Sequence, residues 1–299
     1  MAAKVILFIV AFAIAGAAAS FGTVLLAILY FMAAGNAYSQ AASAAYASLG
    51  SAWFTVPYLI AQNILFVLVA VMFVVFIDRG LSPLVELGLR PGAGALRQFL
   101  GGALISLVLA VASIAILLAA GAIRFEAAGP EKYGPAALAA SLAVFLVATL
   151  FIGLGEEALF RGYLQRLLGG RYGVVAGLIA TSIIFALAHT VTYDRPLPIM
   201  GVFMASAVMG YLFVITGSLW ASIGLHAAWD FLFLQVFELG KPTIELGSYP
   251  LLLFSSPRQV AAGGVSLGGL DDLVATALLA LTLVALYIYD RRRRARSEK

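Results

Sequence analysis

Between Lys4 and Asp78 the sequence contains no Asp, Glu, Lys or Arg. This stretch restricts the possible folds, because a water-soluble domain needs charged residues on its surface whereas hydrocarbon disfavours them. The whole chain of 299 residues shows the same bias, being 63% hydrophobic and 11% charged. A soluble domain usually has about 25% charged residues. We therefore expect an all-α, polytopic membrane helix bundle and exclude an ordinary soluble protein.

Apolar runs of membrane-spanning length recur along the whole sequence. A helix needs about 20 mostly apolar residues to cross about 30 Å of hydrocarbon. The runs predict about eight transmembrane helices, at residues 5–32, 53–77, 99–123, 135–155, 174–189, 199–216, 219–237 and 273–289. Between the last two runs we expect a loop, at the surface or re-entering the membrane, because prolines bound its short apolar piece 251–254.

The loop charges predict the orientation of the chain. With both termini in the cytoplasm, thirteen Lys and Arg lie inside and five lie outside. The inner set is Lys4, Arg79, Arg90, Arg97, Arg161, Arg166, Arg171, Arg291, Arg292, Arg293, Arg294, Arg296 and Lys299, and the outer set is Arg124, Lys132, Arg195, Lys241 and Arg258. The positive-inside rule favours this orientation, and an even number of spans agrees with it. The predicted location is a bacterial inner membrane, since arginine outnumbers lysine in an Ala- and Gly-rich chain, which hints at GC-rich coding DNA.

The sequence has no cysteine and only two histidines, His189 and His226. This excludes disulfides, cysteine-ligated zinc and cysteine nucleophiles, so any chemistry must use oxygen and imidazole groups. The net charge of +4 comes largely from the basic C-terminal run. Such a run after an apolar helix is typical of a cytoplasmic anchor that touches anionic lipid. We expect the lipid bilayer, and no nucleic acid, as a partner.

Ionisable residues stand at the end of the fourth apolar run. Glu156 and Glu157 precede Arg161 in a segment that is expected to stay helical through Gln165. In a helix, Glu157 and Arg161 form an i,i+4 ion pair with the acid on the favourable N-terminal side. Glu156 then lies on a neighbouring face and is free for another task.

Both histidines also lie in apolar segments. His189 ends the run 185–189, and His226 shares a helical face with Asp230, which could orient its ring. An ionisable side chain in lipid costs free energy unless it is paired or faces a cavity, so these residues are functional candidates. The amides Gln62 and Asn63 in the second run are expected to hydrogen-bond between helices.

These segments resemble the three motifs of the CPBP intramembrane protease family, which includes the type II CAAX prenyl endopeptidases. The motifs are Glu156-Glu157-x-x-x-Arg161, Phe185-x-x-x-His189 and His226-x-x-x-Asp230. The resemblance covers about residues 135–237, and its last position is Asp where many members have Asn. We accordingly expect one membrane domain in three parts: helices without motif support at 1–130, the motif-bearing core at 131–240, and a loop, last helix and basic tail at 241–299.

The resemblance implies a set of catalytic roles. Glu156 would be the general base, and His189 would help to hold and polarise the attacking water. His226 and Asp230 would face the scissile carbonyl, with Glu157 and Arg161 as supporting residues. Because an ionised carboxylate is a poor oxyanion donor, Asp230 must either be protonated or serve to orient His226.

A metal-dependent mechanism is equally compatible with these residue types. Glu156, His189 and His226 make a three-ligand set that leaves an open position for water on a divalent metal, with zinc the best candidate. The compact H-E-x-x-H helix is absent, so the ligands would have to converge from three helices. Both mechanisms stay open at this level.

Convergence of the motifs is a structural requirement of either mechanism. At about 1.5 Å per residue, a hairpin turning at 169–171 brings Glu156 and His189 to depths within one or two helical turns of each other. His226 follows the turn at 217–219 so closely that this turn must be sunk into the protein, where its backbone can line a cavity. We expect Glu156, His189, His226 and Asp230 to share one pocket.

The predicted function is an intramembrane endopeptidase that opens toward the cytoplasm and cuts a membrane-associated or hydrophobic peptide or protein. For a bacterial chain, a substrate other than a prenylated CAAX protein is expected. One alternative is a non-catalytic immunity or partner protein, in which the polar cluster is a buried ion-pair network. Another is a proton-coupled transporter, which the lack of repeat symmetry disfavours.

Overall fold

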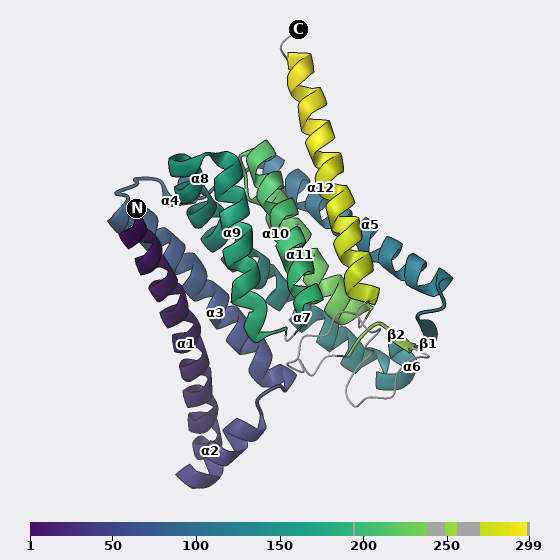
Figure 1. Ribbon diagram of the computed structural model, residues 1–299. Coiled ribbons are helices and arrows are strands. Elements are labelled where there is room, and N and C mark those ends of the chain that lie inside the picture. Colours follow the sequence, from purple (N-terminus) through teal and green to yellow (C-terminus); the bar gives the residue numbers. More distant parts are fainter. Residues whose placement is uncertain (194, 238–248, 256–269, 298–299) are drawn as a thin grey trace.

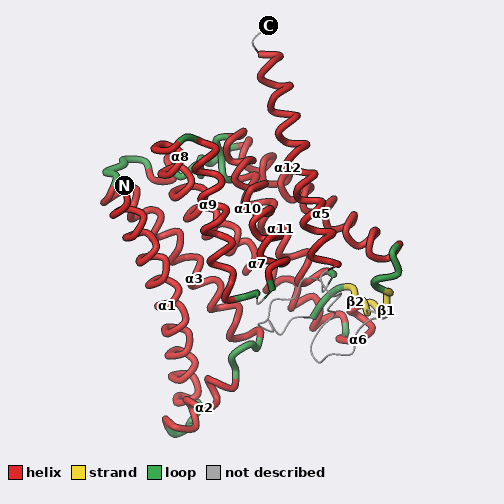
Figure 2. The backbone as a smooth tube through the Cα atoms, viewed as in Figure 1, coloured by secondary structure: helices red, strands yellow, loops and turns green. Residues whose placement is uncertain are grey.

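The computed structural model describes residues 1–193, 195–237, 249–255 and 270–297. These residues form a bundle of helices with a two-stranded sheet at one end (Figure 1). Figure 2 shows that helix makes up nearly all of the described chain. The predicted all-α, multi-pass membrane bundle is confirmed, since six of the described helices are long and apolar enough to cross a membrane.

The helices are α1 (Ala2–Ala33), α2 (Tyr38–Ala47), α3 (Ala52–Met72), α4 (Pro83–Glu86), α5 (Ala93–Ala119), α6 (Gly129–Tyr133), α7 (Pro135–Glu157), α8 (Arg166–Tyr172), α9 (Val174–Ala188), α10 (Pro196–Thr216), α11 (Trp220–Phe231) and α12 (Leu270–Ser297). Segments of π-helix follow three of them, at Phe73–Ile77, Ala158–Gln165 and Leu232–Val236, and a 3₁₀ turn, His189–Val191, follows α9. The strands are β1 (Arg124–Ala128) and β2 (Leu252–Ser255).

Each of the eight apolar runs is helical, but two of the helices are short. α9 has 15 residues and α11 has 12, fewer than the about 20 that a full crossing needs. Six of the eight predicted helices therefore reach spanning length within the described residues, and α9 and α11 are the two shorter ones. α11 can be short because it lies inside the bundle: its residues from Ala221 to Ala227 are all buried.

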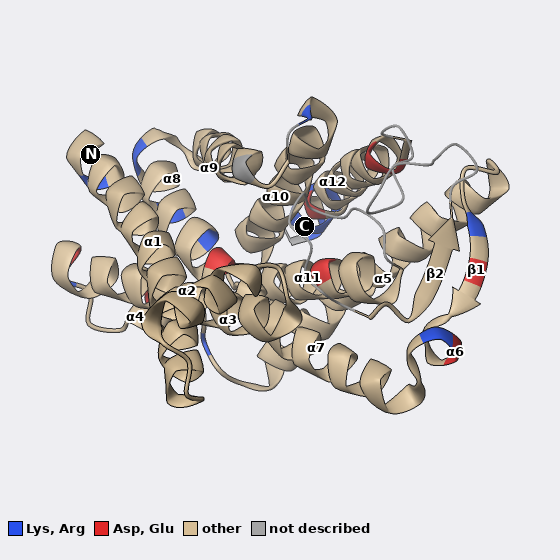
Figure 3. Cartoon of the chain, turned by 90° about the horizontal axis from the view of Figure 1, so that it is seen from below, with Lys and Arg blue, Asp and Glu red and all other residues tan. Residues whose placement is uncertain are grey.

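Both chain termini lie at the same end of the bundle (Figure 1), as an even number of passes requires. At this end Lys4 forms an ion pair with Asp78, which ties the start of α1 to the end of the α3 segment. Seen from the opposite end (Figure 3), most of the ribbon is free of charge and the few acidic and basic positions are scattered among the helices. The cytoplasmic location of the termini stays a prediction.

The helix that carries the first motif is unusually long. α7, the π-helical segment and α8 form one apolar helical stretch from Pro135 to Tyr172, so the predicted continuation through Gln165 is confirmed. The chain reverses at Gly173 rather than at 169–171, because Gly173 has a left-handed φ of 93° that glycine adopts without strain. The π-helical segment starts directly after Glu157, and such segments are frequent at functional sites.

Glycines allow α11 to pack directly against α5. A Cβ atom at Gly102 would lie 1.9 Å from the carbonyl oxygen of Ala221, and one at Gly224 would lie 2.0 Å from that of Phe99. Small residues at a helix contact permit this close backbone approach in membrane proteins. The contact fixes the depth of α11 and therefore the position of the third motif.

The turn before α11 is sunk into the protein, as expected. Leu219 is fully buried, and its backbone N–H donates a hydrogen bond of 3.0 Å to the carbonyl of Gly88. Gly217 and Ser218 line a cavity of about 950 Å³ on the side of the chain termini. The polar backbone of this turn is therefore satisfied within the protein, which membrane depth requires.

Part of the expected loop after α11 forms a strand. β2 pairs antiparallel with β1, with Phe125 opposite Phe254, and the two rings lie 5.9 Å apart. Phe254 is buried against residues of α5 and of the segment after α11, whereas Phe125 stays exposed, so the apolar piece at 251–254 packs on the bundle as well as pairing with β1. The remainder of the loop, at 238–248 and 256–269, lies outside the described residues.

Candidate functional site

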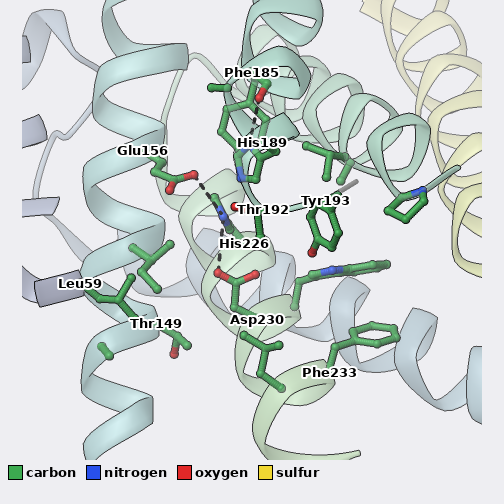
Figure 4. A pocket seen from close by; sticks show the side chains of 18 of the residues that line it. Leu59, Thr149, Glu156, Phe185, His189, Thr192, Tyr193, His226, Asp230 and Phe233 are labelled. Carbon is green, nitrogen blue, oxygen red and sulfur yellow. Dashed lines mark hydrogen bonds and ion pairs between the residues drawn. The ribbon is translucent and has the colours of Figure 1, made fainter. Parts of the chain in front are cut away.

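The four predicted catalytic residues line one cavity of about 610 Å³ inside the bundle. Glu156 comes from α7, His189 from the end of α9, and His226 and Asp230 from α11 (Figure 4). The expected convergence in one pocket is therefore observed, although the catalytic role of each residue stays a prediction. The rest of the cavity wall is largely apolar and aromatic.

Glu157 and Arg161 form the predicted i,i+4 ion pair. Nη1 of Arg161 lies 2.6 Å from Oε1 of Glu157, and neither side chain is exposed. Nη2 of Arg161 also donates to the hydroxyl of Ser206 on α10, at 2.8 Å. Because a buried charge without a partner is strongly unfavourable, this network holds the end of α7 against α10.

Glu157 also contacts the third motif. Its Oε1 accepts a hydrogen bond of 2.9 Å from Nδ1 of His226. Nδ1 therefore carries a proton, which it shares with Glu157. The opposite nitrogen, Nε2, then faces the cavity, at 3.6 Å from Oδ2 of Asp230 and 3.8 Å from Oε2 of Glu156. A carboxylate that holds one imidazole nitrogen in this way fixes both the tautomer and the direction of the ring.

His189 is oriented by its own helix. Its Nδ1 donates to the carbonyl oxygen of Phe185 at 2.8 Å, which leaves Nε2 for the cavity. The Phe185 ring packs 4.5 Å from the His189 ring and lies under the Arg161 guanidinium, 4.3 Å from its carbon. Phe185, to which the sequence assigns no chemical role, thus links the buried ion pair to the second motif by packing and by its carbonyl.

Glu156 is the carboxylate with fewest commitments. Its Oε2 is buried and has no hydrogen-bond partner within the described part of the chain, although His226 lies near it. The Glu156 side chain is 16% exposed, whereas that of Glu157 is fully buried and paired with Arg161. Of the two adjacent acids, Glu156 is therefore the one available to a substrate or a water.

The predicted metal ligands Glu156, His189 and His226 line the same cavity, but in the described residues their side chains are not arranged around a common point. No group of three or more His, Asp or Glu side chains among residues 1–193, 195–237, 249–255 and 270–297 has the spacing of a metal-binding set. Glu156 and His226 are close to each other, and His189 completes the lining of the same cavity. A requirement for zinc or another divalent metal stays a prediction, and no chemical step is derived through one.

Residues 138–232 match the family model of the Rce1-like type II CAAX prenyl endopeptidases. Residues 138–232 are therefore similar to this protease family. The matched residues extend from α7 through α11 and include every motif residue, in agreement with the resemblance to the CPBP family. Searches of curated proteins and of solved structures found no match to the chain. The family supports an integral membrane endopeptidase with a peptide or protein substrate in general terms.

The lining of the candidate site cavity extends toward one end of the bundle. It includes Gly50, before α3, and Asp271 and Asp272 at the start of α12, and these two helices begin at the end of the bundle remote from the chain termini (Figure 1). Aromatic residues that also line it pack in one cluster, with the Phe12 and Phe160 rings 5.6 Å apart. The side of the membrane from which the cavity opens stays a prediction.

Several residues that line the 610 Å³ cavity were not predicted from the sequence. Tyr193 and Thr192 follow the 3₁₀ turn after α9 and face the cavity (Figure 4), and their position directly after His189 was the available signal. Gln62 also lines the cavity, but its amide donates to Tyr58 on its own helix at 2.9 Å. Asn63 likewise donates to Leu59 of α3 at 2.9 Å. Within the described part of the chain, the donor bonds of both amides stay inside α3 rather than reaching another helix.

Proposed function

We propose that this protein is an intramembrane endopeptidase in which Glu156 activates the water that attacks a peptide carbonyl. The observation that carries the proposal is the asymmetry of the two adjacent acids. Glu157 is fully buried and its Oε1 is shared by Arg161 and His226, whereas Glu156 lines the cavity, is partly exposed and in the described chain has only a 3.8 Å contact with His226. A general base has to be free to accept a proton from a bound water.

The proposed reaction is a simple hydrolysis. The water oxygen bonds to the carbonyl carbon while its proton moves to Glu156, which gives a tetrahedral species with a negatively charged oxygen. The C–N bond then breaks, and the departing nitrogen takes the proton from Glu156. The products are a carboxylic acid and an amine, and Glu156 is again ionised.

The two histidines suit different tasks. Nδ1–H of His189 donates to the Phe185 carbonyl, so its neutral ring presents Nε2 to the cavity as a hydrogen-bond acceptor. A water that donates one proton to Glu156 and the other to His189 directs a lone pair toward the substrate. Nε2 of His226 instead faces the carboxylates of Asp230 and Glu156, which favour a proton on it, so His226 would act as a hydrogen-bond donor in the cavity.

The cavity favours a substrate with a hydrophobic segment. Its walls include Phe54, Tyr58 and Phe145, and the exposed wall area is mainly apolar. Such a pocket accepts an apolar chain or side chain and holds it by burial. We propose a membrane-associated peptide or protein as substrate; prenylated CAAX sequences are the substrates that the matched family name denotes.

The side of access follows from two independent features. The cavity reaches the bundle end remote from the termini, and the excess of Lys and Arg places the termini in the cytoplasm. Together they support an entrance in the outer half of the membrane, opposite to the cytoplasmic opening expected from the sequence. The substrate would then be a segment exposed on, or inserted from, the non-cytoplasmic side.

The alternatives of a non-catalytic partner protein and a proton-coupled transporter explain less of the geometry. A purely structural ion-pair network gives no reason for Glu156, His226 and Asp230 to line one cavity together with His189. The sequence also lacks the internal repeat symmetry that is common in transporters.

The test is cleavage by the purified protein in lipid vesicles. A set of internally quenched fluorogenic peptides, each with a hydrophobic segment, is screened with wild-type protein and with Glu156→Gln. We expect Glu156→Gln to lower kcat by about 10²–10⁴-fold, the usual contribution of a general base, while KM changes little. Glu131→Gln, an exposed acid on α6, is the matched control and should retain wild-type activity.

Two results would overturn the proposal. Unchanged cleavage by Glu156→Gln would remove its proposed base, and absence of cleavage across the peptide set, with correctly folded protein, would favour the partner-protein alternative. Each preparation is also assayed after treatment with 1,10-phenanthroline and after return of Zn²⁺. Chelator-resistant activity supports the glutamate mechanism, and loss of activity that Zn²⁺ restores supports the metal-dependent one.

A further inference from the structure

A second cavity, the recess of about 950 Å³ on the side of the chain termini, carries positive charge. Arg90, which follows α4, and Arg166, at the start of α8, both line it. Within the described chain neither guanidinium forms an ion pair. Glu86 is the only described acid in the lining, and its Oε1 accepts a hydrogen bond from the backbone N–H of Ser82 at 3.2 Å. The two arginines are therefore available to an anion.

The backbone holds both arginines in fixed places. The indole Nε1–H of Trp220, the first residue of α11, donates to the carbonyl oxygen of Arg90 at 2.9 Å. Arg166 opens α8, which continues the helical stretch of the first motif. A Cβ atom added at Gly94 or Gly170, which also line the recess, would meet nothing within 4 Å. The recess therefore has a fixed frame and an open interior.

Part of the recess wall is apolar. Val85, Val174 and Phe213 line it, and the two valines are exposed. Leu81 and Leu84, just before Val85 in the chain, are exposed as well, and Leu81 is 96% exposed. Such a group of exposed apolar side chains is expected to face lipid rather than water. The arginines of the recess then lie at the depth of the lipid headgroups, which long basic side chains reach from a helix end.

We propose that the recess binds the phosphate headgroup of an anionic membrane lipid. Arg90 and Arg166 hold the phosphate, since a guanidinium matches phosphate oxygens in charge and in hydrogen-bond geometry. The apolar part of the wall takes the first part of the acyl chains. A free phosphate ion shares the first contact but has nothing to place against the apolar wall, so the lining favours a lipid.

This lipid site is separate from the candidate active site. The recess shares no described lining residue with the cavity that holds Glu156. The proposal therefore does not depend on the proposed peptidase activity, and the two can fail independently.

A topological bias also gathers arginines at one side of a membrane protein, so charge alone does not make a site. The test accordingly needs a matched pair of arginines outside the recess. Arg291 and Arg292 are exposed residues of the last turns of α12 and line neither cavity. Replacing either pair by glutamine removes the same two charges.

The test measures binding of phosphatidylglycerol to the purified full chain in neutral detergent, by native mass spectrometry over a titration of the lipid. We expect the apparent Kd to rise by about 5-fold for each arginine lost, and so by about 30-fold in the double variant Arg90→Gln, Arg166→Gln, from the usual contribution of a basic residue to anionic-lipid binding. The control Arg291→Gln, Arg292→Gln should stay within about twofold of wild type, because an exposed charge away from the ligand is screened. Phosphatidylcholine should bind wild-type protein at least about 10-fold more weakly, because its choline cation offsets the phosphate charge.

Three results would overturn the proposal. Equal weakening in the two double variants would show that the whole basic end attracts the lipid, without a site in the recess. Displacement of the lipid by excess inorganic phosphate, but not by chloride at the same ionic strength, would make a free phosphate ion the occupant. Equal binding of the two lipids would remove the role of the arginines.

Thermal unfolding in the same detergent checks that each variant is folded. If the glutamine variant of the recess is unfolded, Arg90→Lys with Arg166→Lys replaces it, because lysine keeps the charge but lacks the planar fork that grips a phosphate. This variant should still bind phosphatidylglycerol more weakly than wild type does, and unchanged binding would contradict the proposed contact.

Discussion

Oε1 of Glu157 accepts hydrogen bonds from two motifs at once, from Nη1 of Arg161 at 2.6 Å and from Nδ1 of His226 at 2.9 Å. One buried carboxylate oxygen thus joins the end of α7, the π-helical segment after it and α11. The ion pair is a structural device, but it also fixes which nitrogen of His226 faces the cavity. Support of the fold and orientation of the candidate site are therefore the same interaction.

Removal of the cation should destabilise this junction. In Arg161→Met the buried Glu157 loses its charged partner, and breaking such a pair costs about 3–5 kcal/mol of folding free energy. We expect a clear drop in the thermal unfolding midpoint in detergent and loss of peptide cleavage. Arg166→Met, an exposed arginine at the start of α8, is the matched control, and equal stability of the two variants would contradict the structural role of the pair.

The glycine contact between α5 and α11 should tolerate no side chain. A Cβ atom at Gly102 would meet the Ala221 carbonyl oxygen at 1.9 Å, whereas nothing lies within 4 Å of a Cβ atom at the neighbouring Gly101. Gly102→Ala must push α11 away from α5 and shift His226 relative to Glu156, so we expect lower stability together with lower kcat. Gly101→Ala should behave as wild type in unfolding and cleavage assays. The reverse order of effects would show that the helix contact is wrong.

The proposed side of access can be measured directly, because the chain has no cysteine. We expect Leu49→Cys, at an exposed position beside the cavity entrance, to react with a membrane-impermeant maleimide in intact cells. Ser218→Cys lines the recess on the side of the termini and should react in inside-out vesicles instead. If the labelling is reversed, the cavity opens toward the cytoplasm and the orientation predicted from the loop charges is wrong.

Much of the fold was predictable because the membrane restricts the use of charge. Hydrocarbon excludes ionised side chains, so the uncharged runs mark the helices and the rare exceptions mark the site. The pair Glu157–Arg161 could be predicted for a further reason, since helical periodicity alone brings residues four apart together. The same local rule gave the shared face of His226 and Asp230.

Contacts between distant segments could not be predicted in this way. The length of α11 depends on the sunk turn at Leu219, which is held by the backbone of Gly88, and no local pattern encodes that bond. The strand pairing of Phe125 with Phe254 likewise joins residues far apart in the chain. The cavity itself is lined by residues of α1, α3, α7 and α10–α12, so its shape also depends on contacts between distant segments.

The sequence by itself determined that this is a membrane protein of helical class, and it marked the three groups of residues proposed to carry its chemistry, because burial in lipid and the helical repeat act locally along the chain. Only the tertiary structure decided how the two acids divide their roles. Glu157 is committed to Arg161 and His226 while Glu156 faces the cavity, and this difference arises from the helices that pack around them. The position of Tyr193 beside Asp230 was decided in the same way, by the meeting of the turn after α9 with α11.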